Sequence, residues 1–390
     1  MKARSGVNSD LSHVLVNGQT VAVTLAGGRI AALTPVAGPA QAVMMPLVAD
    51  PHVHLDKCFT AHRCQAAKPG LFGAIEAMAA DKVLWTATDL QARITLGLED
   101  AFANGVGVMR SHVDWTEPGV PLAWSVMEDV ATTGITLQRA ALVSLEILGD
   151  PDHGPKIAAR VAADGGVLGT FVYRHANFAA HLAQVFRLAA DHGLRLDFHV
   201  DEGLDADAVA IDEIARLTLA YGMVGRVLCG HACSLSIRPD ADRAIALMAK
   251  AGLALTILPT TNLHLQDMTA GRSPRLRGLA PAQELRAAGV RVLFGSDNVR
   301  DPFYPYGAHD PIEMLRLACL TLHLSPDDWL GAITDDAARA MGLPPKRLAV
   351  GEPADFILIK GADWTEALSN PRAGRRIFRA GALQMQGHAA

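Results

Sequence analysis

The sequence lacks any long hydrophobic run and any strong excess of charge of one sign. No stretch of about 18 consecutive apolar residues occurs in it, which excludes a membrane-spanning helix. The formal net charge is -5, so electrostatics favour neither a nucleic acid nor a membrane surface as partner. Five cysteines, an odd number, and an N-terminal stretch without an apolar core predict a cytoplasmic protein with reduced thiols and no secretory leader.

Both ends of the chain have the texture of short strands. Residues 11–47 contain Asn-Gly and Gly-Gly turns between alternating apolar residues, and residues 354–387 look similar. Neither segment is long enough to bury a core alone. We therefore expect residues 1–47 and 348–390 to pair into one small β-sandwich domain, with residues 48–347 as a continuous insert between them.

The middle of the chain alternates apolar strand-like runs with amphipathic helical stretches. The strand candidates are residues 45–55, 106–114, 135–145, 166–173, 194–200, 226–233, 253–259 and 291–298. Eight strands with intervening helices predict an α/β fold, a (β/α)8 TIM barrel. A doubly wound open sheet is the alternative, but it requires a glycine-rich turn after the first strand, and this sequence has none.

Histidines and carboxylates recur where several of these strands end, which is the functional face of such a barrel. They are His52 and His54 after the first strand, His112 and Asp114 after the second, His199, Asp201 and Glu202 after the fifth, His231 after the sixth, and Asp297 and Asn298 after the eighth. Residues two apart on a strand point to the same side, so the first two histidines form a pair. Side chains from separate strand ends are therefore expected to converge on one site.

A catalytic divalent cation requires three or four nitrogen and oxygen ligands and one position left for water. We expect three neutral imidazoles and one carboxylate to supply them: His52, His54, His199 and Asp297. Glu202 lies three residues beyond His199 and can reach a substrate without binding the cation, as a proton shuttle must. His231 is placed to hold the attacking water or to stabilise developing negative charge.

Other polar residues near the strand ends have simpler interpretations. We expect His112 to be a hydrogen-bonded structural residue and Lys57, in a loop, to be solvated. Cys229 and Cys233 flank His231, but their spacing fits neither a zinc knuckle nor a redox motif, so both are expected to be packing residues. A non-catalytic ligand binder on a decayed barrel is an alternative that the intact ligand set disfavours.

The ordered series of motifs resembles the amidohydrolase superfamily, and within it the bacterial cytosine deaminase group. The segments that carry the resemblance are PHVHLDK, LFGAIEAMAADK, RSHVD, HVDEGLD, GHACSLS, LPTTNLHLQ and FGSDNVRDPFYPYG. It implies a distorted (β/α)8 barrel with a β-sandwich built from both chain ends. It also implies one iron or zinc ion on the four ligands named above, with Glu202 as acid/base and His231 and Asp297 assisting the water.

The same resemblance implies four substrate contacts. Leu71 matches a residue whose backbone contacts the pyrimidine, and Phe303 matches an aromatic that closes over the ring. Ser144 stands where relatives carry a glutamine, and Asn298 stands where they carry a second aspartate. A missing hydrogen-bond partner discriminates strongly between substrates, so plain cytosine is not assumed and a 5-substituted cytosine such as 5-methylcytosine is a candidate.

The activity implied by the resemblance is hydrolytic release of ammonia from the exocyclic amine of a cytosine-type pyrimidine. The alternative within the superfamily is hydrolysis of another cyclic amidine or amide, such as an aminotriazine, an alkylaminotriazine or a creatinine-like ring. The cytidine-deaminase type of zinc enzyme requires a P-C-x-x-C motif, which this sequence lacks. The expected partner is a small nucleobase-like molecule, and family members often assemble into homo-oligomers.

Overall fold

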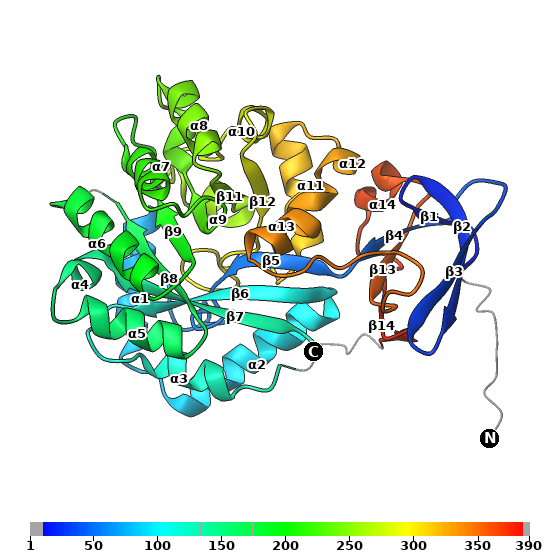
Figure 1. The fold of residues 1–390 in the computed structure, drawn as a ribbon, viewed down its shortest axis with the longest axis horizontal. Coiled ribbons are helices and arrows are strands. Elements are labelled where there is room, and N and C mark those ends of the chain that lie inside the picture. Colours follow the sequence, from blue (N-terminus) through cyan, green and yellow to red (C-terminus); the bar gives the residue numbers. More distant parts are fainter. Residues whose placement is uncertain (1–10, 133, 174, 385–390) are drawn as a thin grey trace.

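The computed structural model describes residues 11–132, 134–173 and 175–384. Eight parallel strands form one sheet in sequence order and confirm the predicted barrel (Figure 1). These strands are β5 (Val48–Val53), β6 (Val106–Trp115), β7 (Thr136–Ser144), β8 (Val167–Val172), β9 (Leu196–Val200), β10 (Val227–His231), β11 (Ala254–Ile257) and β12 (Arg291–Phe294). The first and last strands approach each other where the Asp297 amide donates to the His52 carbonyl over 2.9 Å, which nearly closes the barrel.

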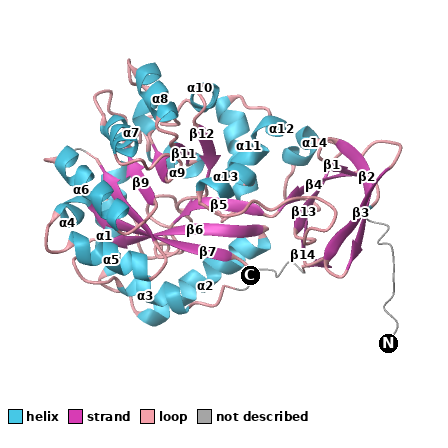
Figure 2. Cartoon of the chain, in the orientation of Figure 1, coloured by secondary structure: helices cyan, strands magenta, loops and turns pink. Residues whose placement is uncertain are grey.

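Helices surround the barrel on its outer side (Figure 2). They are α1 (Gly70–Lys82), α2 (Ala87–Ala103), α3 (Leu122–Asp129), α4 (Leu145–Gly149), α5 (Gly154–Ala163), α6 (Phe178–Asp191), α7 (Ala210–Ala220), α8 (Ala241–Lys250), α9 (Pro259–Leu265), α10 (Ala282–Ala287), α11 (Pro311–Leu322), α12 (Pro326–Trp329) and α13 (Asp335–Ala340). Helix α8 shows why they pack there: Ala244, Ile245 and Met248 are buried on one face at helical spacing. No helix of the described ranges has the length and apolar character that crossing a membrane requires.

The two chain ends build a second sheet of seven strands beside the barrel (Figure 1). Its strands are β1 (Val14–Val16), β2 (Gln19–Ala26), β3 (Arg29–Pro35), β4 (Ala42–Pro46), β13 (Phe356–Lys360), β14 (Arg376–Arg379) and β15 (Ala382–Leu383), and helix α14 (Trp364–Ser369) lies between β13 and β14. The ends meet where β4 pairs with β13 in antiparallel register, Met45 opposite Ile357. This confirms the predicted pairing of the ends. The exact domain limits stay predictions, and residues 1–10 and 385–390 lie outside the described residues.

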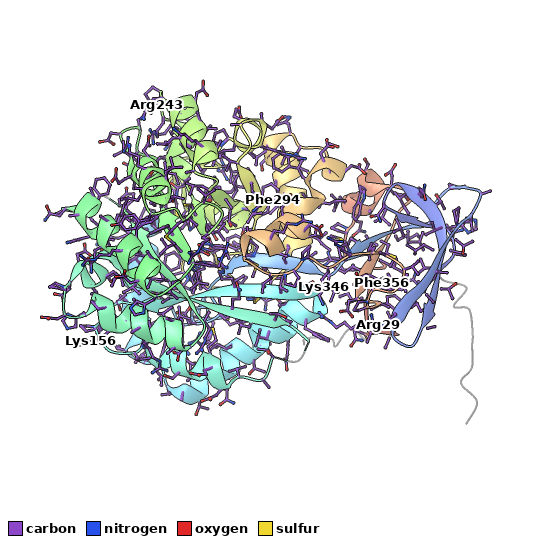
Figure 3. The ribbon with its side chains drawn as sticks, viewed as in Figure 1. Arg29, Lys156, Arg243, Phe294, Lys346 and Phe356 are labelled. Atoms are coloured by element: carbon purple, nitrogen blue, oxygen red, sulfur yellow. The ribbon has the colours of Figure 1, made fainter. Side chains whose placement is uncertain are left out.

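The barrel and the second sheet have separate apolar clusters, and Figure 3 labels one member of each, Phe294 and Phe356. Phe294 ends β12 and is fully buried between the barrel and its helices, with its ring 5.8 Å from that of Trp329. Phe356 lies in the other sheet and stacks on Phe378 at 4.6 Å. The barrel core therefore fixes the strand ends, and with them the polar residues that follow each strand.

Candidate active site

The chain leaves several barrel strands in an uncommon backbone conformation. His231, Asp201 and Asp297 have positive φ angles of 70°, 48° and 58°. A residue with a side chain rarely adopts the left-handed region, and such strain clusters at functional sites. These turns come directly after β10, β9 and β12, where the side chains predicted to form the site begin.

Three histidines and one aspartate meet at the carboxyl ends of β5, β9 and β12. The Nε2 atom of His199 lies 3.0 Å from Nε2 of His52 and 3.1 Å from Nε2 of His54. The Oδ1 atom of Asp297 lies 3.6 Å and 3.3 Å from the same two nitrogens of His52 and His54. All four side chains are buried, none more than 4% exposed. The structure therefore brings together the four predicted ligand atoms.

The donor atoms of this cluster fit a divalent cation. The three histidines turn their Nε2 atoms toward one another, and both carboxylate oxygens of Asp297 have no hydrogen-bond partner among the described residues. Buried polar atoms are normally hydrogen-bonded, so such a cluster needs another partner. Burial and the neighbouring imidazoles lower the pKa of His52 and His199 well below the usual range, which leaves neutral nitrogen donors. The ligand atoms of His52, His54 and His199 lie within 4.8 Å of one another, as do those of His52, His231 and Asp297, so the cluster could hold a metal ion.

Glu202 and His231 lie beside the cluster. Glu202 Oε1 is 3.5 Å from His231 Nδ1, and both side chains are buried. Burial, reinforced by the charge of Asp297, raises the pKa of Glu202 to about 8, and burial lowers the pKa of His231 to about 4. A carboxyl group with a raised pKa can deliver a proton, so the position and the environment both suit the predicted role of Glu202.

Helix α9 contributes two residues that the sequence reasoning did not single out. The Asn262 side-chain amide lies 3.0 Å from His231 Nδ1, and the Gln266 amide donates to the Glu202 carbonyl over 2.5 Å. A donor at Nδ1 leaves the proton of a neutral imidazole on Nε2. That Nε2 has no partner among the residues described. Both residues belong to the LPTTNLHLQ segment, so the available signal was the motif itself.

A cavity of about 670 Å³ opens above the cluster. It is lined by five of the predicted metal and catalytic residues, His54, His199, Glu202, His231 and Asp297, and by all four predicted substrate contacts, Leu71, Ser144, Asn298 and Phe303. Apolar side chains of α1 and β8, among them Ile75, Met78 and Phe171, form much of the remaining wall. His52 lies behind this surface and is fully buried. The cavity therefore combines the candidate metal ligands with an apolar wall.

Lys57 is not solvated, so that expectation was wrong. Its side chain is only 6% exposed, and Nζ lies 2.9 Å from Asp114 Oδ1 and 4.9 Å above the Phe303 ring. Burial alone would lower the pKa of Lys57, but Asp114 and Asp56 outweigh it and raise that pKa. The turn after β5 folds this lysine inward onto the cavity wall. The sequence showed only that Lys57 lies in a loop, which gave no sign that it is buried.

The expectation for His112 also fails, whereas that for the cysteines holds. Neither ring nitrogen of His112 has a hydrogen-bond partner in the described part of the chain, and its ring packs 4.1 Å from the His52 ring. Its ring contacts that of a predicted metal ligand at an interplanar angle of 37°, because β5 and β6 are neighbours. Cys229 and Cys233 are free thiols and fully buried, as packing residues are.

Comparison with known proteins defines the class. The model of the amidohydrolase family matches residues 152–373 of this chain. The chain is also 36% identical over 348 residues to a pterin deaminase of Rhizobium rhizogenes (strain K84), covering 87% of this chain and 80% of that protein. The chain belongs to the amidohydrolase family, a class of hydrolases whose members bind a divalent metal ion.

Two solved structures share the whole architecture. The 5-methylcytosine deaminase of Klebsiella pneumoniae, liganded with 5-fluorocytosine, superposes with a TM-score of 0.84 at 24% identity and covers 97% of both chains. N-isopropylammelide isopropylaminohydrolase of Burkholderia multivorans superposes with a TM-score of 0.76 at 24% identity, covering 95% of this chain and 96% of that one. These likenesses confirm the barrel with its accompanying sheet.

Proposed function

We propose that this protein is a metal-dependent deaminase that releases ammonia from the exocyclic amine of an amino-oxo heterocycle. The observation that carries the proposal is the buried cluster of three imidazoles and one carboxylate, with Glu202 beside it, at the base of a cavity of about 670 Å³. Iron and zinc both suit a ligand set of this kind. A deaminase relative at 36% identity supports the reaction type.

A cation on these ligands would act as a Lewis acid and activate a water molecule. Three residues of the chain then position the attacking oxygen and transfer the protons. His231 donates a hydrogen bond from Nε2 to the attacking oxygen, and Glu202 gives a proton to the ring nitrogen beside the carbon under attack. Asp297 accepts the first proton that the water releases and returns it to the departing amine, and the second proton, on the new hydroxyl, goes back to Glu202 as the carbonyl forms. The new C–O bond replaces the C–N bond, and ammonia leaves.

The preferred substrate that we infer is a two-ring amino-oxo heterocycle of the pterin type. The cavity volume lies in the range of sites that enclose drug-sized ligands, so a second fused ring has room. Leu71, Phe171 and Phe303 offer apolar walls for a flat ring system. The name of the 36% identical relative points to the same chemistry.

A cytosine-type pyrimidine is the second candidate. Ser144 and Asn298 line the cavity at the two positions where the resembling group carries a glutamine and an aspartate. The shorter hydroxyl and the neutral amide favour a 5-substituted ring such as 5-methylcytosine over plain cytosine. Other cyclic amidines and amides, including aminotriazines and creatinine-like rings, complete the set to be compared.

The test is an ammonia-release assay with protein reconstituted with Zn²⁺ or Fe²⁺. Pterin, cytosine, 5-methylcytosine, an aminotriazine and creatinine are compared by kcat/KM, with Glu202→Gln as the matched inactive control. We expect pterin to give the highest value. A higher value for a single-ring substrate would refute the two-ring preference, and no ammonia from any of them would refute the deaminase proposal.

A further inference from the structure

One charged side chain on the cavity wall takes no part in the chemistry proposed above. Lys57 lies three residues after the ligand His54, lines the cavity and is nearly fully buried. Within the described ranges, Asp114 is the one carboxylate within 4 Å of its Nζ atom. A buried ammonium group is costly unless its donors are satisfied, so the surroundings of Nζ matter.

Asp114 fixes the position of Lys57 without using its full capacity to donate. A lysine ammonium has three donors, and the contact with Asp114 Oδ1 accounts for one of them. The other oxygen of Asp114 pairs with Lys82, and the Asp114 backbone amide donates to Asp56 Oδ2 over 3.1 Å. The Asp114 carboxylate therefore pairs with both lysines, and the Asp114 backbone is fixed by its hydrogen bond to Asp56. This arrangement leaves donors of Lys57 available to a molecule in the cavity.

The position of Lys57 suits the oxygen of a bound ring. Its ammonium lies 4.9 Å above the Phe303 ring, and Phe303, Ser144 and the metal cluster line the same cavity. A ring that turns its amine toward the cluster also buries its oxo oxygen in the cavity, where an unpaired acceptor would be unfavourable. The side chain of Ser144 is short, and its hydroxyl is a neutral donor, whereas the ammonium of Lys57 is charged. Hydrogen bonds from charged donors are stronger than those from neutral ones.

We propose that Lys57 determines specificity by donating a hydrogen bond to the ring oxo oxygen of the substrate. This inference rests on the proposed function. A direct contact makes the effect of replacing Lys57 depend on the oxo group of the substrate. If Lys57 only neutralised Asp114, the effect would not depend on the substituents of the ring. The substrate itself therefore supplies the discriminating probe, in the form of an analogue that lacks the oxo group.

The experiment compares pterin with 2-aminopteridine in the wild-type protein and in Lys57→Met. Cytosine and 4-aminopyrimidine take their place if the single ring is the better substrate. We expect Lys57→Met to lower kcat/KM about 10- to 100-fold for the oxo substrate and to change it little for the analogue. Metal content should stay at the wild-type level. Lys82→Met is the comparison variant: Lys82 also lines the cavity and pairs with Asp114, but the proposal gives it no contact with the oxo group, so both substrates should be affected equally.

Three results would overturn the inference. Equal losses on both substrates in Lys57→Met, as in Lys82→Met, would mean that Lys57 only supports Asp114. A retained preference for the oxo substrate would assign that preference to another residue. If Lys57→Met does not fold, Lys57→Leu, which also lacks a donor, replaces it under the same criterion. A wild-type protein that releases no ammonia from any of these compounds refutes the proposed function too, and is recognised before any variant is made.

Discussion

Replacing Gly230 with alanine should displace a metal ligand without removing any polar group. Gly230 lies in β10, directly behind His52. A Cβ atom placed on it would lie 2.7 Å from Cε1 and 2.9 Å from Nδ1 of that imidazole, where ordinary contacts begin at 3.4 Å. The ring must therefore move by roughly 0.7 Å, since the glycine is fixed within the sheet. Metal–ligand distances tolerate only about 0.2 Å.

The expected result is a loss of metal affinity of about 10- to 100-fold, the range seen when the support of a ligand is disturbed. The assay is a chelator competition titration followed by metal analysis. Gly119→Ala is the control, because a Cβ atom there would have nothing within 4 Å. Thermal unfolding separates a general loss of stability from a local one. Wild-type metal affinity in Gly230→Ala would refute the reasoning that this glycine positions His52.

Two further predictions concern Glu202 and His309. Glu202→Gln should keep a full metal complement while kcat falls roughly 100- to 10,000-fold, and unchanged turnover would contradict the proton-transfer role. His309 is fully buried, and burial, with the positive charge of Arg300 adding to it, lowers its pKa from 6.5 to about 3. Below pH 6.5 the His309 imidazole is therefore protonated in the unfolded chain but stays neutral in the folded chain. This difference lowers the free energy of unfolding by about 2 kcal/mol at pH 5. His309→Gln should lose less stability than the wild type between pH 7 and pH 5 in urea unfolding, and equal losses would contradict this.

The barrel could be predicted because its strands are apolar runs of characteristic length separated by amphipathic helices. Residues 106–114, for example, were predicted as a strand that the structure places at Val106–Trp115. The ligand set followed from the same pattern, since the carboxyl ends of parallel strands share one face. His52, His199 and Asp297 come from three strands far apart in sequence, yet their donor atoms meet.

The missed features depend on how loops fold back, which periodicity does not encode. The burial of Lys57 follows from the turn after β5 and from Asp114 on the neighbouring strand. Asn262 reaches His231 from a helix that begins after β11. The ring contact between His112 and His52 depends on the register of β5 against β6, which includes irregular steps. Each of these contacts joins residues whose relative placement is set by tertiary packing.

The most direct test of the central claim is the metal content of the purified protein, measured beside that of His199→Ala. His199 Nε2 lies within 3.1 Å of both other ligand imidazoles, so its removal should open the centre of the cluster. We predict one divalent ion per wild-type chain and its loss from His199→Ala with the fold intact. A wild-type chain that takes up no divalent ion, or a variant that keeps a full complement, would contradict the account.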